Sequence, residues 1–103
     1  MPPKRSLRKV LDEVAPVRCA AGRGLIREEV WQNADGEIAR YNLAFINHFM
    51  MSRDNGRVLG YDNSHGHHHR HFKGVAEPLA YVDYPSLRER FISEVRELRK
   101  ELP

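Results

Sequence analysis

The stretch from Arg40 to Phe49 alternates between two kinds of side chain, and this period of two constrains the fold more than any other feature. One set of positions holds Tyr41, Leu43, Phe45 and Phe49, and the intervening set holds Arg40, Asn42, Ala44, Ile46 and His48. Because successive side chains of a β-strand point to opposite faces, the pattern predicts a strand whose aromatic face lies in a core.

Turn signals on both sides of this strand predict an antiparallel sheet built from hairpins. Residues 33–36 end in Asp-Gly and residues 52–56 end in Asn-Gly, and both dipeptides are typical of tight turns. Neighbouring strands are therefore expected over residues 25–31 and 57–61. A short further strand is predicted over residues 79–82.

The C-terminal residues 84–102 predict an amphipathic helix. The run Ser86 to Glu89 fits a capping box, with Pro85 just before it. Apolar side chains at spacings of three and four form one stripe, which holds Leu87, Phe91, Ile92, Val95, Leu98 and Leu102. Hairpins followed by one helix predict an α+β fold, in which the helix packs on one face of a small antiparallel sheet.

The first 23 residues predict a basic N-terminal extension that contains a short helix. Over Ser6 to Ala15, apolar side chains recur at i, i+3, i+4 and i+7, with Ser6 as a candidate N-cap and Pro16 as a stop. At 103 residues the whole chain, 1–103, is expected to be a single domain. That domain divides into the extension over 1–23, the sheet over 24–82 and the helix over 84–102.

Composition narrows the classes of function. The longest uninterrupted apolar run is Leu43 to Ile46, which is far too short for a membrane span, and no apolar stretch follows the basic start Met1 to Arg5 as it would in a secretory signal. Cys19 is the only cysteine, which excludes an internal disulfide and favours a reducing cytoplasm. The net charge of +3 favours an anionic partner. A chain of this size buries only about two-thirds of its unfolded surface, so self-association is an open alternative.

Histidine is the unusual residue type, because five of the six histidines lie between His65 and His71. One chemistry that suits them is metal binding. On an extended strand His67, His69 and His71 would point the same way and could ligate a divalent metal. Asp62 could serve as a further ligand or could fix the tautomer of an imidazole.

The second chemistry is acid–base catalysis without a cofactor. RNA carries its own nucleophile, the 2′-hydroxyl, and its cleavage needs a base, an acid and a cation beside the phosphate. Imidazoles titrate near neutral pH and can move both protons, whereas Arg70 and Lys73 can neutralise the phosphate. Two other interpretations stay open: a polar strand without a site, and a basic module that binds RNA or a partner without cleaving it.

At this segment the sequence resembles the TumE family of bacterial toxin–antitoxin toxins. The family signature is Tyr-Asp-Asn-small-His-Gly, a short variable spacer and His-His-Arg-His, and the spacer here is His67 alone. The matching positions are Tyr61, Asp62, Asn63, His65, Gly66, His68, His69, Arg70 and His71. The resemblance spans roughly Gly24 to Leu102, and it departs from the family pattern at residues 58–60, where a more charged strand is usual.

The resemblance implies a cytoplasmic toxin that acts on RNA and is neutralised by a helix-turn-helix antitoxin. Combined with the chemistry of the segment, it predicts a ribonuclease. The predicted catalytic groups are His65 with His68 or His69, and Asp62 as the group that orients an imidazole. The predicted substrate-binding residues are Tyr61, Asn63, Arg70, His71 and Lys73. No cofactor is expected, and a metal-dependent hydrolase built on His67, His69 and His71 is the alternative.

Overall fold

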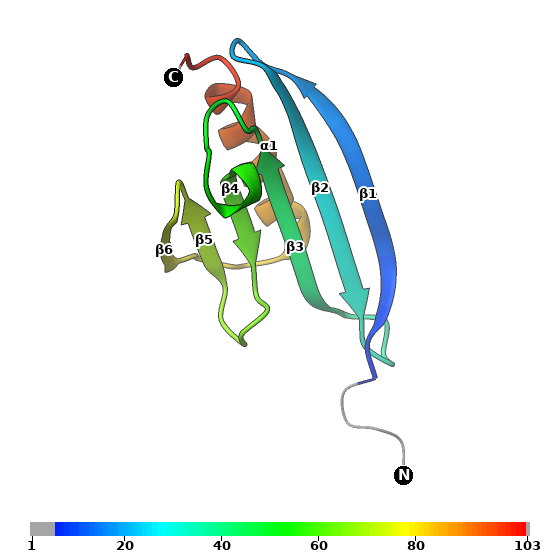
Figure 1. Ribbon diagram of the computed structural model, residues 1–103. Helices are drawn as coiled ribbons and strands as arrows, with labels where there is room; N and C mark the ends of the chain where they lie inside the picture. The colour runs from blue at the N-terminus through cyan, green and yellow to red at the C-terminus, as the bar shows by residue number, and fades with distance from the viewer. Residues whose placement is uncertain (1–5, 103) are drawn as a thin grey trace.

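The computed structural model describes residues 6–102, which form one six-stranded antiparallel sheet and one long helix (Figure 1). The strands follow one another across the sheet in chain order. They are β1 (Arg8–Arg18), β2 (Arg23–Gln32), β3 (Ile38–Ile46), β4 (Arg57–Asp62), β5 (His69–Phe72) and β6 (Val75–Pro78). A short 3-10 helix, η1 (Asp54–Gly56), lies between β3 and β4, and the helix α1 (Tyr84–Leu98) follows β6. The predicted α+β class and the strands expected over 25–31 and 57–61 are confirmed.

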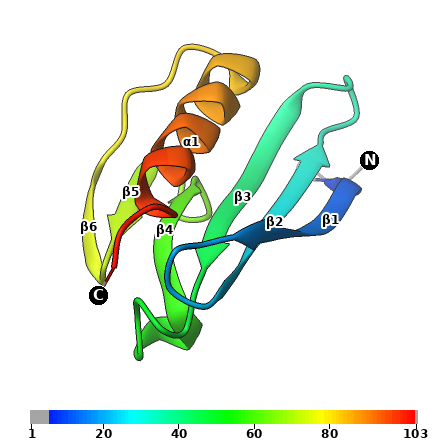
Figure 2. The ribbon, with the colours of Figure 1, turned by 90° about the horizontal axis from the view of Figure 1, so that it is seen from above.

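The core lies between the sheet and α1, which runs along one face on the side of β4 and β5 (Figure 2). We call this the helix face and the opposite one the open face. Tyr41, Leu43 and Phe45 of β3 are at most 1% exposed and lie on the helix face, as their alternation predicts. From α1, Leu87 and Phe91 pack into the same core. The open face therefore receives the intervening residues of β3, which are Arg40, Asn42, Ala44 and Ile46.

α1 begins at Tyr84, as predicted, but its N-cap is not the Ser86 of the predicted capping box. The N-cap is Asp83, whose Oδ1 accepts a hydrogen bond of 2.8 Å from the Ser86 backbone N–H. Asp83 takes this position because Pro85 fits the first turn of a helix, where a backbone N–H has no intrahelical partner. The helix ends at Leu98, earlier than the predicted end at Leu102, and Leu102 is exposed.

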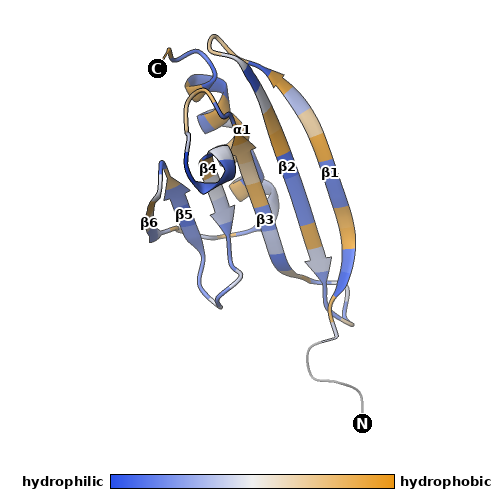
Figure 3. Ribbon diagram, in the orientation of Figure 1, coloured by the Kyte–Doolittle hydropathy of each residue, from blue (hydrophilic) through white to orange (hydrophobic). Residues whose placement is uncertain are grey.

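The helix predicted over residues 6–15 is wrong, because this segment is the edge strand β1. Polar and apolar residues follow one another in bands along β1 (Figure 3), and a bulge at Val10 brings Leu11 opposite Val30 on the helix face. An isolated helix this short is marginal in water, whereas pairing along its length with β2 satisfies the backbone groups that point toward that strand. Pro16 is tolerated because it lies in an edge strand. The sheet thus begins at Arg8 rather than at residue 24, and the basic residues Lys4 and Arg5 lie outside the described residues.

Two further predictions about strand limits are wrong. Phe49 is 72% exposed rather than part of the core, because β3 ends at Ile46 and the buried Asn47 side chain accepts hydrogen bonds from the backbone of the turn that follows. The last strand is β6 and not residues 79–82. Lys73 and Gly74 both have positive φ and reverse the chain directly after β5, so the strand starts at Val75.

Candidate functional site

The histidine-rich segment is divided between the two faces of the sheet. β5 begins at His69, and alternation along it sends His69 and His71 to the open face and Arg70 and Phe72 to the helix face. His67 precedes the strand. The segment therefore supplies two separate groups of side chains rather than one continuous cluster.

Asp62, at the end of β4, is the centre of the group on the open face. Its Oδ2 atom lies 3.1 Å from Nε2 of His71, and its Oδ1 atom accepts hydrogen bonds from the backbone N–H and the hydroxyl of Ser64, at 3.2 and 3.0 Å. Nη1 of Arg57 lies 4.0 Å from the same Oδ2. His69 pairs directly with Asp62 across the two strands. We call Arg57, Asp62, His69 and His71 the Asp62 cluster.

Arg57 is a member of this cluster that simple alternation would not place there. Counting by twos from Tyr61 puts Arg57 on the helix face, but a bulge at Val58 shifts the register so that Arg57 lies opposite Ile46 on the open face. Arg57 was not among the predicted site residues, because an arginine next to a turn is by default a solvated charge. The available signal was the adjacent apolar pair Val58 and Leu59, both of which are fully buried.

Gly60 leaves the space that the Arg57 side chain occupies. A Cβ atom at Gly60 would lie 2.9 Å from Cδ of Arg57 and 3.3 Å from its Nη1 atom. Arg57 also donates a hydrogen bond of 2.9 Å from Nε to Asp54. The guanidinium is thus held between Asp54 and Asp62, above a strand position that has no side chain.

Three imidazoles form a row beside Asp62. The ring centroids of His67 and His69 are 6.0 Å apart, and those of His69 and His71 are 6.1 Å apart. Within residues 6–102, no group of three or more His, Cys, Asp or Glu side chains has an arrangement that could hold a metal ion. His71 is the member of the row in contact with a carboxylate.

His68 lies apart from the Asp62 cluster. Its Nδ1 atom forms a hydrogen bond of 2.8 Å with the hydroxyl of Tyr41, and its ring stacks on Tyr81 with the centroids 4.0 Å apart. Burial, assisted by the neighbouring His69, lowers the pKa of His68. This histidine therefore has the surroundings of a packed, neutral side chain.

Arg70 and Tyr61 lie on the helix face, where both bond the α1 residue Glu94. Arg70 also donates from Nη1 to Glu77 at 2.9 Å, and the bonds to Glu94 raise the pKa of Arg70. Burial by itself would raise the pKa of Glu94, but hydrogen bonds from Arg70 and Tyr61 outweigh burial and lower it. The guanidinium that was predicted to bind phosphate is thus engaged by two carboxylates.

The other predicted site residues have different surroundings. The Asn63 side chain accepts a hydrogen bond from the Tyr41 backbone N–H and donates one to the Ala39 carbonyl, at 3.0 and 3.1 Å. His65 is exposed in the turn after β4, and Lys73 is exposed in the turn between β5 and β6. Of the predicted residues, the structure brings together Asp62, His69 and His71, and it separates them from His68, Arg70 and Tyr61.

The fold and the site define a small α+β protein with a histidine–aspartate contact on the open face of its sheet. The sequence model of the family described as Toxin TumE matches residues 21–99. Because this match covers well over half of the 103 residues, the chain belongs to the TumE toxin family. Comparison with curated proteins found no match, and neither did comparison with solved structures.

Membership of this family makes the chain a toxin of a toxin–antitoxin system, and such a toxin has an antitoxin partner. The family match includes the whole Asp62 cluster and all of α1, whereas β1 precedes it. Within residues 6–102, no helix has the length and apolar character needed to cross a membrane.

Proposed function

We propose that this toxin cleaves RNA by transferring protons through the histidines of the Asp62 cluster. The observation that carries the proposal is the 3.1 Å contact between Nε2 of His71 and Oδ2 of Asp62, beside Arg57. A carboxylate that holds one imidazole nitrogen fixes the tautomer and leaves the other nitrogen available for proton transfer. Arg57 supplies the positive charge that the developing phosphorane needs.

The reaction follows from the nucleophile that RNA itself provides. His71 takes the proton of the 2′-hydroxyl, whose oxygen then attacks phosphorus and forms the P–O2′ bond. The P–O5′ bond breaks, and a protonated His69 gives its proton to the departing 5′-oxygen. The products are a 2′,3′-cyclic phosphate and a 5′-hydroxyl, and no oxidant or co-reactant is consumed.

This assignment keeps His69 and Asp62 in their predicted roles and replaces two of the other predicted residues, one histidine and one arginine. His71, which was predicted to bind substrate, replaces His65 in the acid–base pair, because His65 is exposed in the turn after β4. Its partner is His69 rather than His68, because His68 is packed against Tyr81 and bonded to Tyr41. Arg57 replaces Arg70 as the cation beside the phosphate. Arg70 lies on the helix face and is hydrogen-bonded to both Glu94 and Glu77, whereas Arg57 lies on the open face, donates one hydrogen bond to Asp54 and has its Nη1 atom 4.0 Å from Asp62. His65 and Lys73 are exposed and could contact the flanking RNA backbone.

The proposal extends to the partner and the compartment. A toxin that cleaves RNA acts in the cytoplasm, where its substrate is made. We propose that its antitoxin is a helix-turn-helix protein, as the family resemblance implies, and that it neutralises the toxin by covering the open face. Histidine modification by diethyl pyrocarbonate tests this cover: His69 and His71 should react in the free toxin and be protected in the complex.

The decisive experiment incubates the purified toxin with RNA in excess chelator and analyses the ends of the fragments. Cyclic phosphate or 3′-phosphate ends, with 5′-hydroxyls opposite them, support the proposed transesterification. Cleavage that the chelator abolishes supports instead the metal-dependent hydrolase, which uses water rather than the 2′-hydroxyl. RNA that binds but stays intact under all conditions supports a binding module and overturns the ribonuclease.

A further inference from the structure

A polar pocket on the open face adjoins the Asp62 cluster. It has a volume of about 330 Å³ and lies over β2, β3 and β4. Arg57 and Asp62 line one end, Trp31 and Arg40 line the other, and Glu29 and Asn42 lie between them. The volume is at the lower end of the roughly 300–1,000 Å³ that small-molecule sites occupy, which suits a ligand the size of one nucleotide.

The far end of the pocket is built for stacking. The Cζ atom of Arg40 lies 4.6 Å from the centroid of the Trp31 ring, and Nζ of Lys9 lies 5.1 Å from it. Among residues 6–102 Arg40 has no ion pair, and it is exposed. Aromatic rings and arginine guanidinium planes are the two surfaces on which proteins stack unpaired nucleobases.

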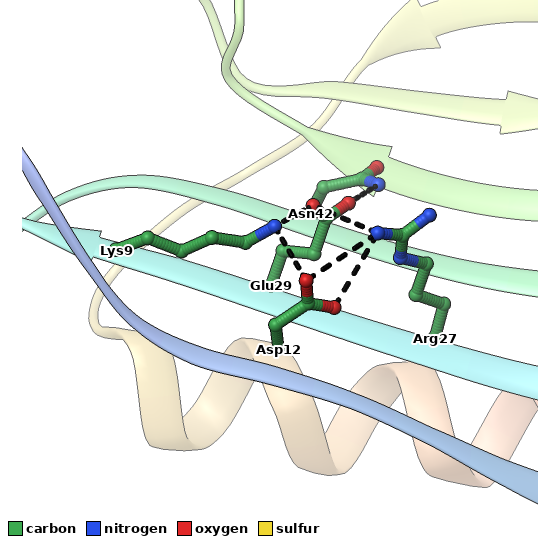
Figure 4. Close-up of polar contacts among 5 residues, drawn as sticks. All are labelled: Lys9, Asp12, Arg27, Glu29 and Asn42. Atoms are coloured by element: carbon green, nitrogen blue, oxygen red, sulfur yellow. Dashed lines mark hydrogen bonds and ion pairs between the residues drawn. The ribbon is translucent and has the colours of Figure 1, made fainter.

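The middle of the pocket is fixed by a network of ion pairs and hydrogen bonds (Figure 4). Lys9 bonds both Asp12 and Glu29, at 2.7 and 2.6 Å, and Asn42 donates to the other oxygen of Glu29 at 2.9 Å. Burial raises the pKa of Glu29, but the bonds from Lys9 and Asn42 outweigh it, and the pKa is lowered. Glu29 is therefore an ionised, positioned acceptor beneath the stacking end.

The distribution of charge in the pocket determines which chemical group of a nucleotide each part can bind. Ionised Glu29 repels a phosphate group but accepts hydrogen bonds from the N–H groups of a neutral base. Arg57, at the opposite end, attracts a phosphate and belongs to the Asp62 cluster. A nucleotide would therefore lie with its base over Asn42 and against Arg40 and Trp31, and with its phosphate toward Arg57.

We propose that this pocket binds one unpaired base of the RNA substrate, on the nucleotide next to the cleaved bond. This inference rests on the proposed ribonuclease function and adds a specificity site to it. Bases paired in an A-form duplex are stacked and cannot enter such a pocket. The toxin should accordingly bind single-stranded RNA and discriminate between bases at one position.

The test uses Trp31, the only tryptophan in the chain, as a reporter. The wild-type protein is titrated with 2′-O-methyl oligonucleotides of the four bases, which lack the attacking hydroxyl and survive the titration. Polyphosphate and a fully paired duplex serve as ligands that carry the charge without an available base. Saturable quenching of the Trp31 fluorescence by at least one single-stranded oligonucleotide, and by neither control ligand, is the expected result.

Two arginine variants are matched in the charge that they remove. Arg40→Ala should weaken the binding seen by fluorescence by roughly 10- to 100-fold, as expected for the loss of one stacking contact. In cleavage assays it should raise KM and flatten the base preference. Arg96→Ala removes the same charge from the exposed side of α1 and should change neither quantity.

Failure of this inference is distinguishable from failure of the proposed function. If RNA is cleaved while Trp31 fluorescence does not respond and Arg40→Ala cleaves like wild type, the pocket is not a base site and the ribonuclease stands. If oligonucleotides quench Trp31 but cleavable RNA stays intact, the pocket binds bases and the ribonuclease is wrong. If quenching and cleavage are both absent, both proposals are wrong.

Discussion

Arg70 and His71 are neighbours in the chain but belong to opposite faces of the sheet. His71 contacts Asp62 on the open face at 3.1 Å, whereas Arg70 bonds Glu94 of α1 on the helix face. A substitution at His71 should therefore impair the reaction, whereas a substitution at the adjacent Arg70 should weaken the packing of α1 on the sheet.

The first prediction concerns the histidine row. His71→Ala and His69→Ala should each lower the rate of RNA cleavage on the order of 100- to 10,000-fold, the usual cost of losing a general acid or base. His67→Ala should be mild, because the His67 ring is exposed and lies beyond His69. Rates are measured on folded protein verified by circular dichroism. Equal losses in all three variants, together with loss of a bound metal, would contradict the assignment and favour the metal alternative.

The second prediction concerns Arg70. Arg70→Ala removes the bonds that join β5 to Glu94, and leaves that carboxylate only partly solvated. The free energy of unfolding in urea should fall by about 1–3 kcal/mol, the usual range for hydrogen bonds to charged groups. The kcat of the remaining folded protein should be nearly unchanged. A variant of wild-type stability that has lost RNA affinity would restore Arg70 to the phosphate-binding role that the sequence suggested.

The third prediction uses Gly60 to move Arg57 without removing it. Gly60→Ala places a methyl group 2.9 Å from Cδ of Arg57, which is too close, and the flexible arginine side chain can swing away from Asp62. We expect RNA cleavage to slow by roughly tenfold or more, since Arg57 loses its position beside the phosphate. In the double variant with Arg57→Ala, the glycine change should add little, because residues that act as a unit are not additive. Fully additive effects would mean that Gly60 acts through the strand and not through Arg57.

The fourth prediction concerns pH and His68. Burial lowers the pKa of His68 in the folded protein below the unfolded value of about 6.5. Below that pH the unfolded chain binds the proton more readily, so the contribution of His68 to stability should be lost as pH falls from about 6.5 through the folded pKa. Urea unfolding between about pH 7 and about pH 5 measures this slope, above the range in which Glu94 is protonated.

His68→Asn provides the matched control for this slope. The variant has no titrating group at the position, so its stability should depend less on pH over the same range. Its RNA cleavage should stay close to that of wild type after correction for folded protein, because His68 packs on Tyr81 and not on Asp62. If the variant has the same pH slope as the wild type, the pH dependence of stability in this range does not come from His68.

The local sequence pattern determined many of the secondary-structure elements of this protein and its family. The alternation of Tyr41, Leu43 and Phe45 predicted a half-buried strand, the Asp-Gly and Asn-Gly turns predicted hairpins, and the stripe from Leu87 to Leu98 predicted a helix on the sheet. These features depend on the chemistry of residues a few positions apart, which the sequence displays directly. The signature around Asp62 likewise indicated the family, because a string of matching residue types needs no tertiary information.

Only the tertiary structure decided which side chains meet. The apolar residues of β1 fit a helix as well as a strand, and pairing with β2 chose the strand. The bulge at Val58 moved Arg57 to the open face, and the stacking of His68 on Tyr81 removed that histidine from the site. Register and rotamer depend on hydrogen bonds and packing between segments far apart in the chain. For that reason the sequence predicted a site in the histidine-rich segment, whereas only the folded structure brings His71 into contact with Asp62.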